Sequence, residues 1–260
     1  MSSVLTPVAP VAPVEGPGEI ALAARSVDAV KLYGGGSNVV CALDHVTVGF
    51  ERGRMTAIMG PSGSGKSTLM HCIAGLDTLT SGHAYIGDTD LTTLNEVELT
   101  RLRRDHIGFV FQSFNLLPTL TALENILLPA RLAKRRPDQQ VVDAVVDTVG
   151  LRTRLTHRPS ELSGGQQQRV AVARALVGRP DIVFADEPTG NLDSHAGGEI
   201  LTFMRTAVRD FGQTIVMVTH DPVAAATADT IVFLSDGRIV DRMDEPTVGK
   251  ILEHLKTLGG

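Results

Sequence analysis

The sequence of 260 residues is poor in aromatic residues and in cysteine, and it carries no basic surplus. It has no tryptophan and two tyrosines, and its net charge at pH 7 is −5. Proteins that bind nucleic acid without sequence preference usually carry excess positive charge, so the composition disfavours this class. The two cysteines, Cys41 and Cys72, are not spaced as a metal-binding or redox pair.

Long apolar segments are also missing. No run approaches the roughly 20 residues that a helix needs to cross a bilayer. The N-terminus does not resemble a secretory signal, because it has no Lys or Arg before Arg25 and is interrupted by prolines. We predict a disordered or polyproline-like tail over residues 1–19, with a ligand for a proline-recognition domain as the alternative. We expect the chain to be soluble, so any membrane role requires a partner.

The most informative segment is a stretch rich in glycine and serine that follows the apolar run "MTAIM". The pattern Gly60-x-x-x-x-Gly65-Lys66-Ser67 fits a phosphate-binding loop. Its glycines let successive backbone N–H groups surround an anion, and a helix beginning near Lys66 adds its positive end. The alternative is a flexible turn. The predicted nucleotide-binding residues here are Gly60, Pro61, Ser62, Gly63, Ser64, Gly65, Lys66, Ser67 and Thr68.

Two side chains of this loop have specific predicted roles. Lys66 can reach the β- and γ-phosphates of a nucleoside triphosphate, and the hydroxyl of Ser67 can ligate Mg²⁺. The loop is followed by a helical pattern whose apolar face comprises Leu69, Cys72, Ile73 and Leu76. An apolar strand before the loop and a helix after it favour a loop that binds a nucleoside triphosphate over a flexible turn.

Hydrophobic patterns predict an α/β protein. Residues 20–59 alternate as short strands, and buried strands are predicted at "IGFVFQ", "DIVFADE" and "TIVMVTH". Between these strands lie helical patterns, which indicates a mostly parallel sheet. Residues 113–162 read as a helical insert, and the β-rich segment "TIVFLSDGRIV" follows the last buried strand.

Capping boxes predict where the helices begin. Thr93 with Glu96 predicts a helix from Thr93 to Arg104, and Thr121 with Glu124 predicts a helix over about 122–134. A further helix carries valines at four-residue spacing and is predicted to end at Gly150.

A pair of carboxylates ends one of the buried strands. Asp186 and Glu187 close "IVFADE", at the edge of an open α/β sheet where ligands gather. Asp186 is predicted to hold Mg²⁺, largely through water, and Glu187 to accept a hydrogen bond from an attacking water. The alternative is a pair of acidic residues that only favours the dipole of the next helix.

A second glycine-rich segment, "LSGGQ", starts another predicted helix. It comprises Ser163, Gly164, Gly165 and Gln166, and a helix N-terminus of this kind can bind an anion. Its structural alternative is a capping box between Ser163 and Gln166. Because the chain has one phosphate loop, the segment has no nucleotide of its own, which suggests that its nucleotide comes from another copy.

These motifs, in this order, resemble the ATP-binding subunit of an ABC transporter. The resemblance rests on the phosphate loop, Gln112, "LSGGQ", "VFADE", "NLD" at 191–193 and His220, and it covers residues 20–245. It implies a P-loop NTPase core of the RecA-like type with an N-terminal antiparallel β subdomain and a helical insert. Residues 20–260 would then form a single ATP-binding domain, with the helical subdomain at about 113–162.

The resemblance also implies roles for individual residues. Two such domains would form a head-to-tail sandwich around two ATP molecules, with Ser163, Gly164 and Gly165 touching the γ-phosphate held by the partner's Lys66. The other implied roles are adenine stacking by Tyr33, sensing of Mg²⁺ and the attacking water by Gln112, a dimer contact by Asp193, and γ-phosphate contact by His220.

A narrower resemblance concerns the type of transporter. "QSFNLLPTLTALENILLP" and "DEPTGNLDS" are similar to the subgroup that serves macrolide or peptide export and lipoprotein release. The implied partner is a permease with four membrane helices per subunit and a large extracytoplasmic domain. The chain would then sit at the cytoplasmic side of the membrane as a peripheral subunit. The segment Phe114 to Pro118 is a candidate docking surface, with buried core as the alternative.

Two other functions remain open at this point. The first is a soluble ABC-type ATPase that acts on DNA or ribosomes, but the span between Gln112 and Ser163 leaves room only for a compact insert. There is also no CxxC pair, no long heptad pattern and no second core. The second is a catalytically silent regulatory subunit, although every catalytic position carries the expected residue type.

Overall fold

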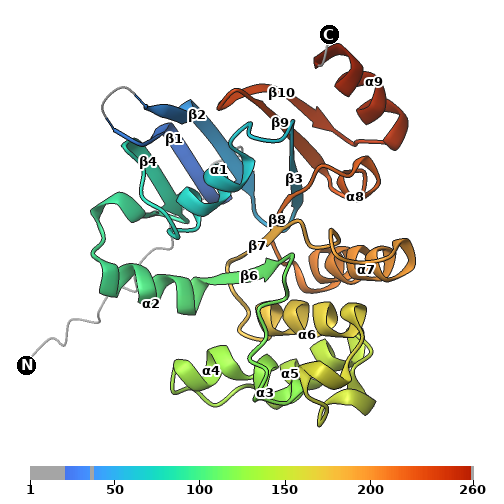
Figure 1. Ribbon diagram of the computed structural model, residues 1–260. Helices are drawn as coiled ribbons and strands as arrows, with labels where there is room; N and C mark the ends of the chain where they lie inside the picture. Colours follow the sequence, from blue (N-terminus) through green and yellow to red (C-terminus); the bar gives the residue numbers. More distant parts are fainter. Residues whose placement is uncertain (1–20, 36–37, 259–260) are drawn as a thin grey trace, which may run out of the picture.

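The computed structural model describes residues 21–35 and 38–258, which fold into two β-sheets surrounded by helices (Figure 1). The tail predicted for residues 1–19 lies outside the described residues. Among the residues described, no helix has both the length and the apolar character needed to cross a membrane.

The larger sheet has six strands in the order β10-β9-β3-β8-β7-β6. Its five strands from β9 to β6 pair in parallel, and β10 pairs antiparallel with β9. Both faces are covered, which explains why the parallel strands are continuous apolar runs. The strands are β3 (Met55–Met59), β6 (Ile107–Phe111), β7 (Ile182–Asp186), β8 (Ile215–Val218), β9 (Thr230–Ser235) and β10 (Arg238–Asp244).

The smaller sheet is antiparallel and has the order β2-β1-β4-β5. Together with helix α1 (Lys66–Ile73) it covers one face of the larger sheet, where Phe50, Leu69 and Ile58 belong to one buried cluster. Its strands are β1 (Leu22–Tyr33), β2 (Val40–Glu51), β4 (Ser81–Ile86) and β5 (Thr89–Asp90).

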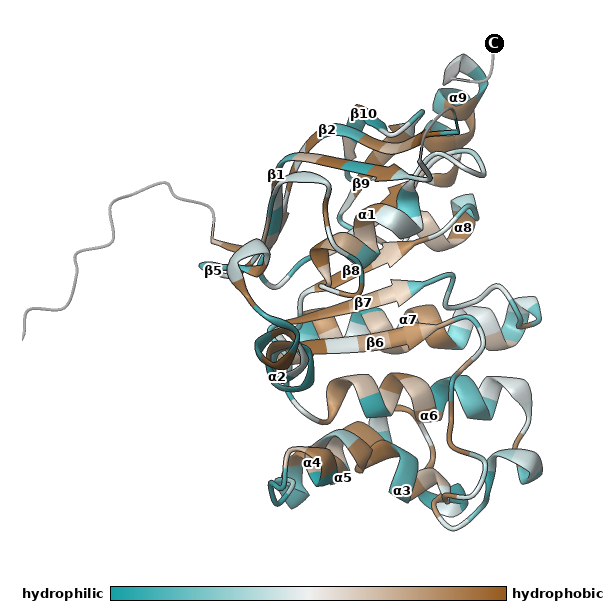
Figure 2. Ribbon diagram, turned by 60° about the vertical axis from the view of Figure 1, so that its left-hand side comes forward, coloured by the Kyte–Doolittle hydropathy of each residue, from teal (hydrophilic) through white to brown (hydrophobic). Residues whose placement is uncertain are grey.

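The opposite face is covered by helices. α6 (Gly164–Leu176), α7 (Ser194–Phe211), α8 (Pro222–Ala225) and α9 (Val248–Leu258) contribute to a second buried cluster with alternate residues of the same strands. A further layer lies on the far side of α6 (Figure 2) and is made of α3 (Ala122–Ile126), α4 (Leu128–Leu132) and α5 (Gln139–Thr148). The predicted α/β class, with an antiparallel sheet at the N-terminus and helices inserted after β6, is confirmed.

The predicted start of the helix expected from Thr93 to Arg104 is wrong. α2 (Glu96–His106) begins after Asn95, whose side chain accepts hydrogen bonds from the N–H groups of Val97 and Glu98. Glu98 completes the capping box on the backbone of Asn95. Thr93 instead ends a 3₁₀ turn, where its hydroxyl donates to the carbonyl of Asp90 at 2.8 Å. Asn is at least as good an N-cap as Thr, so the later box defines the helix.

Two further details differ from the predicted pattern. The helix expected over 122–134 is interrupted at Leu127, because Pro129 has no N–H and its ring would clash with the carbonyl four residues earlier in a continuous helix. The capping box of Thr121 with Glu124 is present at its start. Leu76 does not belong to the buried face of α1, since that helix ends at Ile73 and the Leu76 side chain is exposed.

Candidate functional site

The parallel strands bring the predicted site residues to one edge of the larger sheet. The phosphate loop follows β3, Gln112 follows β6, the Asp186–Glu187 pair lies at the end of β7, and His220 follows β8. These four strands run in the same direction, so their carboxyl ends share an edge. The sequence motifs therefore meet in space although they are up to 160 residues apart.

The phosphate loop needs glycine at its two ends. The backbone of Gly60 has φ +154°, and a Cβ atom there would lie 1.9 Å from the carbonyl oxygen of Leu234. Gly65 has φ +100°, and a Cβ would lie 2.3 Å from the carbonyl oxygen of Ala42. Any side chain at either position would push the loop away from β9 or β2. The glycines thus keep the loop pressed against the sheets with its backbone accessible to a ligand.

Lys66 lies folded over this loop. Its ammonium group is buried and donates hydrogen bonds to the carbonyl oxygens of Gly60 at 2.9 Å and Pro61 at 2.7 Å. Burial lowers the pKa of Lys66, and the carboxylates of Glu187 and Asp186 oppose that shift. The hydroxyl of Ser64 is buried and has no hydrogen-bond partner among the described residues. A cation and an unpaired hydroxyl inside a loop of backbone amides fit a bound phosphate chain.

The start of α1 is joined to the end of β7. The hydroxyl of Ser67 donates to the Oδ1 atom of Asp186 at 3.2 Å, while Nε2 of His71 lies 3.8 Å from Oδ2 of Asp186. A hydroxyl and a carboxylate at this distance are hard oxygen ligands of the kind that Mg²⁺ prefers. The pair therefore fits a Mg²⁺ site that is completed by water and phosphate oxygens. His71 was not among the predicted site residues.

Glu187 and His220 form a hydrogen-bonded pair. Nδ1 of His220 lies 2.7 Å from Oε1 of Glu187, and the His220 side chain is otherwise exposed. Glu187 has φ +47°, a left-handed backbone conformation that non-glycine residues adopt only when the fold imposes it. Its N–H donates to the carbonyl of Val218 at 2.9 Å, which fixes this conformation to β8.

Gln112 is held by the segment that follows β7. Its Nε2 atom donates to Oδ1 of Asn191 at 3.1 Å, and Nδ2 of Asn191 donates back to the carbonyl of Gln112 at 3.0 Å. The geometry thus ties the end of β6 to the segment between Glu187 and Asp193. No hydrogen bond joins Gln112 to Ser67 or Asp186 within the described part of the chain.

The "LSGGQ" segment lines a separate hollow of about 400 Å³. Its capping box is present, because Ser163 Oγ accepts from the N–H of Gln166 and Oε1 of Gln166 accepts from the N–H of Ser163. Asp193 lines the same hollow and caps α7 by accepting from the N–H of Ala196 at 2.9 Å. The rest of the lining comes from the segments 163–169 and 191–199, so the hollow is distinct from the phosphate loop.

Tyr33 lies at the end of β1 with part of its ring exposed. Its hydroxyl donates to Oδ2 of Asp77 at 2.6 Å, just beyond the end of α1. Burial and this hydrogen bond raise the pKa of Tyr33. The structure therefore places the ring beside the helix that starts at the phosphate loop.

Sequence reasoning missed one buried residue of this region. Gln168 is fully buried in α6, and its Nε2 atom donates to the carbonyls of Pro188 at 2.5 Å and Phe111 at 3.4 Å. These carbonyls immediately precede Gln112 and follow Glu187 along the chain. Residues 166–168 are three consecutive glutamines, and the sequence does not indicate which of them faces the interior. In the structure it is Gln168, two residues before the buried Val170.

The chain is similar to known ATP-binding proteins of one family. Residues 43–190 match the family model described as ABC transporter. The chain is 43% identical over 215 residues to the macrolide export ATP-binding/permease protein MacB of Vibrio parahaemolyticus, covering 82% of the chain and 33% of that protein. The chain thus spans about a third of the length of this relative. It is 46% identical over 213 residues to an uncharacterized ABC transporter ATP-binding protein, MJ1508, of Methanocaldococcus jannaschii, covering 81% of the chain and 95% of that protein.

Solved structures of ATP-binding cassettes have a similar fold. The dimeric post-hydrolysis state of the ATP-binding cassette MJ0796, bound to ADP and Pi, superposes with a TM-score of 0.78 at 40% identity, covering 86% of this chain and 99% of that one. CbiO1 of Clostridium perfringens shares the fold with a TM-score of 0.76 at 24% identity, covering 91% of this chain and 92% of the other. The chain therefore belongs to the ABC transporter family.

Proposed function

We propose that this cassette hydrolyses ATP to power a membrane transport complex, as a peripheral subunit at the cytoplasmic side of the membrane. The observation that carries the proposal is the convergence of the phosphate loop, the Ser67–Asp186 pair and the Glu187–His220 pair at one sheet edge. Catalysis of phosphoryl transfer consists mainly of positioning and electrostatic stabilisation, which such an edge can supply.

The phosphate loop binds the triphosphate of ATP. On binding, the Lys66 ammonium group exchanges its hydrogen bonds to Gly60 and Pro61 for phosphate oxygens. The amide groups of residues 60–68 and the N-terminus of α1 surround the remaining phosphate oxygens. The ring of Tyr33 stacks on the adenine.

Ser67 and Asp186 would hold Mg²⁺ at the end of the loop, with Gln112 as a further ligand from the end of β6. The ion would supply positive charge that offsets the charge of the phosphates. For Gln112 to take part, its amide must leave Asn191, to which it is hydrogen-bonded at 3.1 Å. This exchange would connect the occupied site to the helices inserted after β6.

Glu187 orients the attacking water for in-line displacement of the γ-phosphate. Its carboxylate accepts a hydrogen bond from the water, while His220, now 2.7 Å from Oε1, turns its ring toward the γ-phosphate. The left-handed backbone of Glu187 presents its side chain above the sheet edge. Lys66 and His220 stabilise the charge that develops on the transferred group.

The second set of residues acts on the nucleotide of another copy. In a head-to-tail dimer, Ser163, Gly164, Gly165 and Gln166 contact the γ-phosphate at the partner's Lys66, and Asp193 bridges the two protomers. The hollow formed by these residues supports this role, because it is open and carries a helix N-terminus. The dimeric state of the MJ0796 cassette supports the formation of a dimer.

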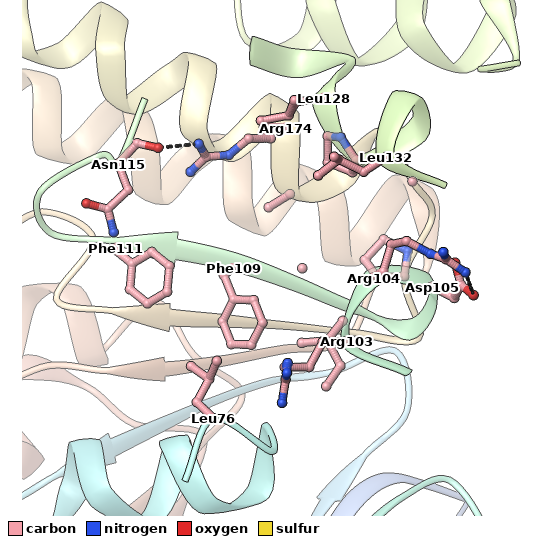
Figure 3. A pocket seen from close by; sticks show the side chains of 16 residues that line it. Leu76, Arg103, Arg104, Asp105, Phe109, Phe111, Asn115, Leu128, Leu132 and Arg174 are labelled. Atoms are coloured by element: carbon pink, nitrogen blue, oxygen red, sulfur yellow. Dashed lines mark hydrogen bonds and ion pairs between the residues drawn. The ribbon is translucent and has the colours of Figure 1, made fainter. Parts of the chain in front are cut away.

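A groove between the central sheet and the inserted helices is the proposed permease docking surface. It has a volume of about 420 Å³, and Figure 3 shows Phe109 and Phe111 of β6 on one side and Leu128 and Leu132 of α4 on the other. Arg174 closes one end by hydrogen bonds to the carbonyls of Phe114 and Asn115. In the segment 114–118, Leu116 packs against the core, as the buried-core alternative requires, whereas Leu117 is exposed and accessible to a partner.

The proposed partner is a permease with four membrane helices and a large extracytoplasmic domain, of the macrolide or peptide export or lipoprotein-release type. The name of the MacB relative, which joins an ATP-binding part and a permease part in one chain, supports this type. Closure of the dimer on ATP would then move the permease, and the substrate would be exported or extracted.

A pull-down from gently solubilised native membranes tests the proposal. Tagged Glu187→Gln protein with ATP should recover a four-helix permease, and adding Leu132→Glu in the groove should abolish recovery. Val97→Glu is the matched control, because Val97 is exposed on α2 and does not line the groove. Glu124 is a poor test position, since it caps α3. Recovery of ribosomes, DNA or a six-helix permease would contradict the proposal.

A further inference from the structure

The exposed ring of Tyr33 is held from two directions by its neighbours. Lys31 and Tyr33 are two residues apart on β1, and their side chains meet beside Asp77. The Lys31 ammonium group lies 4.7 Å from the centre of the Tyr33 ring, over its face. One face of the ring is therefore covered by a cation, and the proposed stacking on adenine would use the opposite face.

Asp77 joins both side chains. Its Oδ2 atom accepts from the Tyr33 hydroxyl at 2.6 Å, and its Oδ1 atom accepts from Lys31 at 2.6 Å. Lys31 also donates to the carbonyl of Thr78 at 2.6 Å and is itself buried. The backbone N–H of Thr78 donates to Oδ1 of Asp77 at 2.7 Å, which fixes the carboxylate in place.

Asp77, which anchors the Tyr33 ring, is connected to the phosphate loop through helix α1. Asp77 follows α1 after a short turn in which the N–H groups of Leu76 and Asp77 donate to the carbonyl of His71. The first residue of α1 is Lys66 of the phosphate loop. A carboxylate at one end of this short helix thus fixes the ring, while the other end holds the phosphate loop.

We propose that Asp77, with Lys31, is a positioning residue that sets the distance and tilt of the Tyr33 ring relative to the phosphate loop, and so contributes to binding of the purine base of ATP. The inference rests on the proposed stacking of Tyr33 on adenine. A ring fixed before the ligand arrives loses less conformational freedom on binding, so the base is bound more tightly. The hydroxyl of Tyr33 is then an anchor rather than a ligand contact.

We would measure the affinities of the full chain for ATP and for inorganic tripolyphosphate by calorimetry. Comparing the two ligands separates the contribution of the base to binding from that of the phosphates. Tyr33→Phe keeps the ring and removes the anchor, and Asp77→Asn keeps the shape and removes the charge. Each should weaken ATP binding about fivefold, the value of one lost orienting hydrogen bond. The double variant should be no weaker than Asp77→Asn alone, because the hydroxyl that Tyr33→Phe removes acts through Asp77. Tripolyphosphate affinity should not change, because this ligand has no base.

Two controls make the outcome specific. Tyr85→Phe alters the chain's other tyrosine, which also lies under a cation, Arg25 at 4.1 Å, and it should bind ATP like the wild type. Tyr33→Ala should weaken ATP binding about ten- to hundredfold through loss of stacking. Wild-type affinity in Tyr33→Ala would overturn the stacking role itself. If Tyr33→Ala loses ATP affinity but Tyr33→Phe and Asp77→Asn bind ATP like the wild type, the anchoring role of Asp77 is overturned and the stacking role is not. The anchoring role is also overturned if Tyr33→Phe and Asp77→Asn lose affinity for tripolyphosphate as much as for ATP.

Discussion

Glu187 occupies a backbone conformation that its side chain does not favour. A left-handed conformation at a non-glycine residue costs about 1–3 kcal/mol, which the surrounding fold must offset. Here the N–H of Glu187 bonds to Val218 and its carboxylate bonds to His220. The letters "FADE" were enough to propose the two carboxylates, whereas nothing in them indicates φ +47° at the second one. Local strain of this kind depends on contacts with β8 that are distant in sequence.

Replacing Lys66, the buried lysine of the phosphate loop, should lower the affinity for ATP without lowering the stability of the fold. Lys66→Ala removes a cation that would contact the phosphates, so ATP affinity should fall about ten- to hundredfold, as expected for hydrogen bonds to a charged group. The melting temperature without nucleotide should change little, because burial disfavours the ammonium group in the free protein. Nucleotide titration and thermal unfolding measure the two effects. Lys250→Ala, at an exposed lysine, is the control, and wild-type ATP affinity in Lys66→Ala would refute the loop's role.

Gln168 should affect turnover more than binding. Gln168→Leu leaves the carbonyls of Phe111 and Pro188 without their donor, so the residues next to them, Gln112 and Glu187, lose their fixed spacing. We expect kcat to fall about tenfold, in line with one lost buried hydrogen bond, while the affinity for ATP stays unchanged. Gln167→Leu, one position earlier and bonded only to the carbonyl of Leu162 among the residues described, should keep its kcat. A parallel loss of affinity would indicate a structural role instead.

At the scale of elements, the position of a helix start is decided by competition between caps. Asn95→Ala should lower the stability by about 1 kcal/mol, because two N–H groups of α2 lose their acceptor. A shift of this size is about 2–4 °C in the melting temperature for a chain of this length. Thr93→Ala should have a smaller effect, since that hydroxyl only donates to Asp90 within a turn. The reverse order would contradict the assignment of Asn95 as the cap.

The same elements show what sequence patterns can and cannot predict. Buried strands such as β7 and β8 were predictable because both faces are covered, so their apolar runs are uninterrupted. The start of α2 was not, because Thr93–Glu96 and Asn95–Glu98 both fit a capping box, and the structure uses the second, with Asn95 as the cap. The break at Leu127 follows from Pro129, a signal that was present in the sequence and overlooked.

At the scale of the whole molecule, the site is made of motifs from four strands of one sheet. The motifs could be identified from the sequence, and the parallel order of β3, β8, β7 and β6 explains why they meet. The groove proposed for docking could not be foreseen, because Phe109 and Leu132 line it together only when the inserted helices fold back over β6. Nor could the pairing of Gln112 with Asn191, which depends on the loops between β6, β7 and α7.

The central claim is that ATP binding joins two copies, each of which completes the other's site. The most direct test is the molar mass of Glu187→Gln protein with Mg²⁺ and saturating ATP, measured by light scattering after size exclusion. The account predicts a dimer with ATP, a monomer with ADP or without nucleotide, and a monomer with ATP when Lys66→Ala is added. A Glu187→Gln protein that stays monomeric at saturating ATP, or hydrolyses ATP at the wild-type rate, would contradict it.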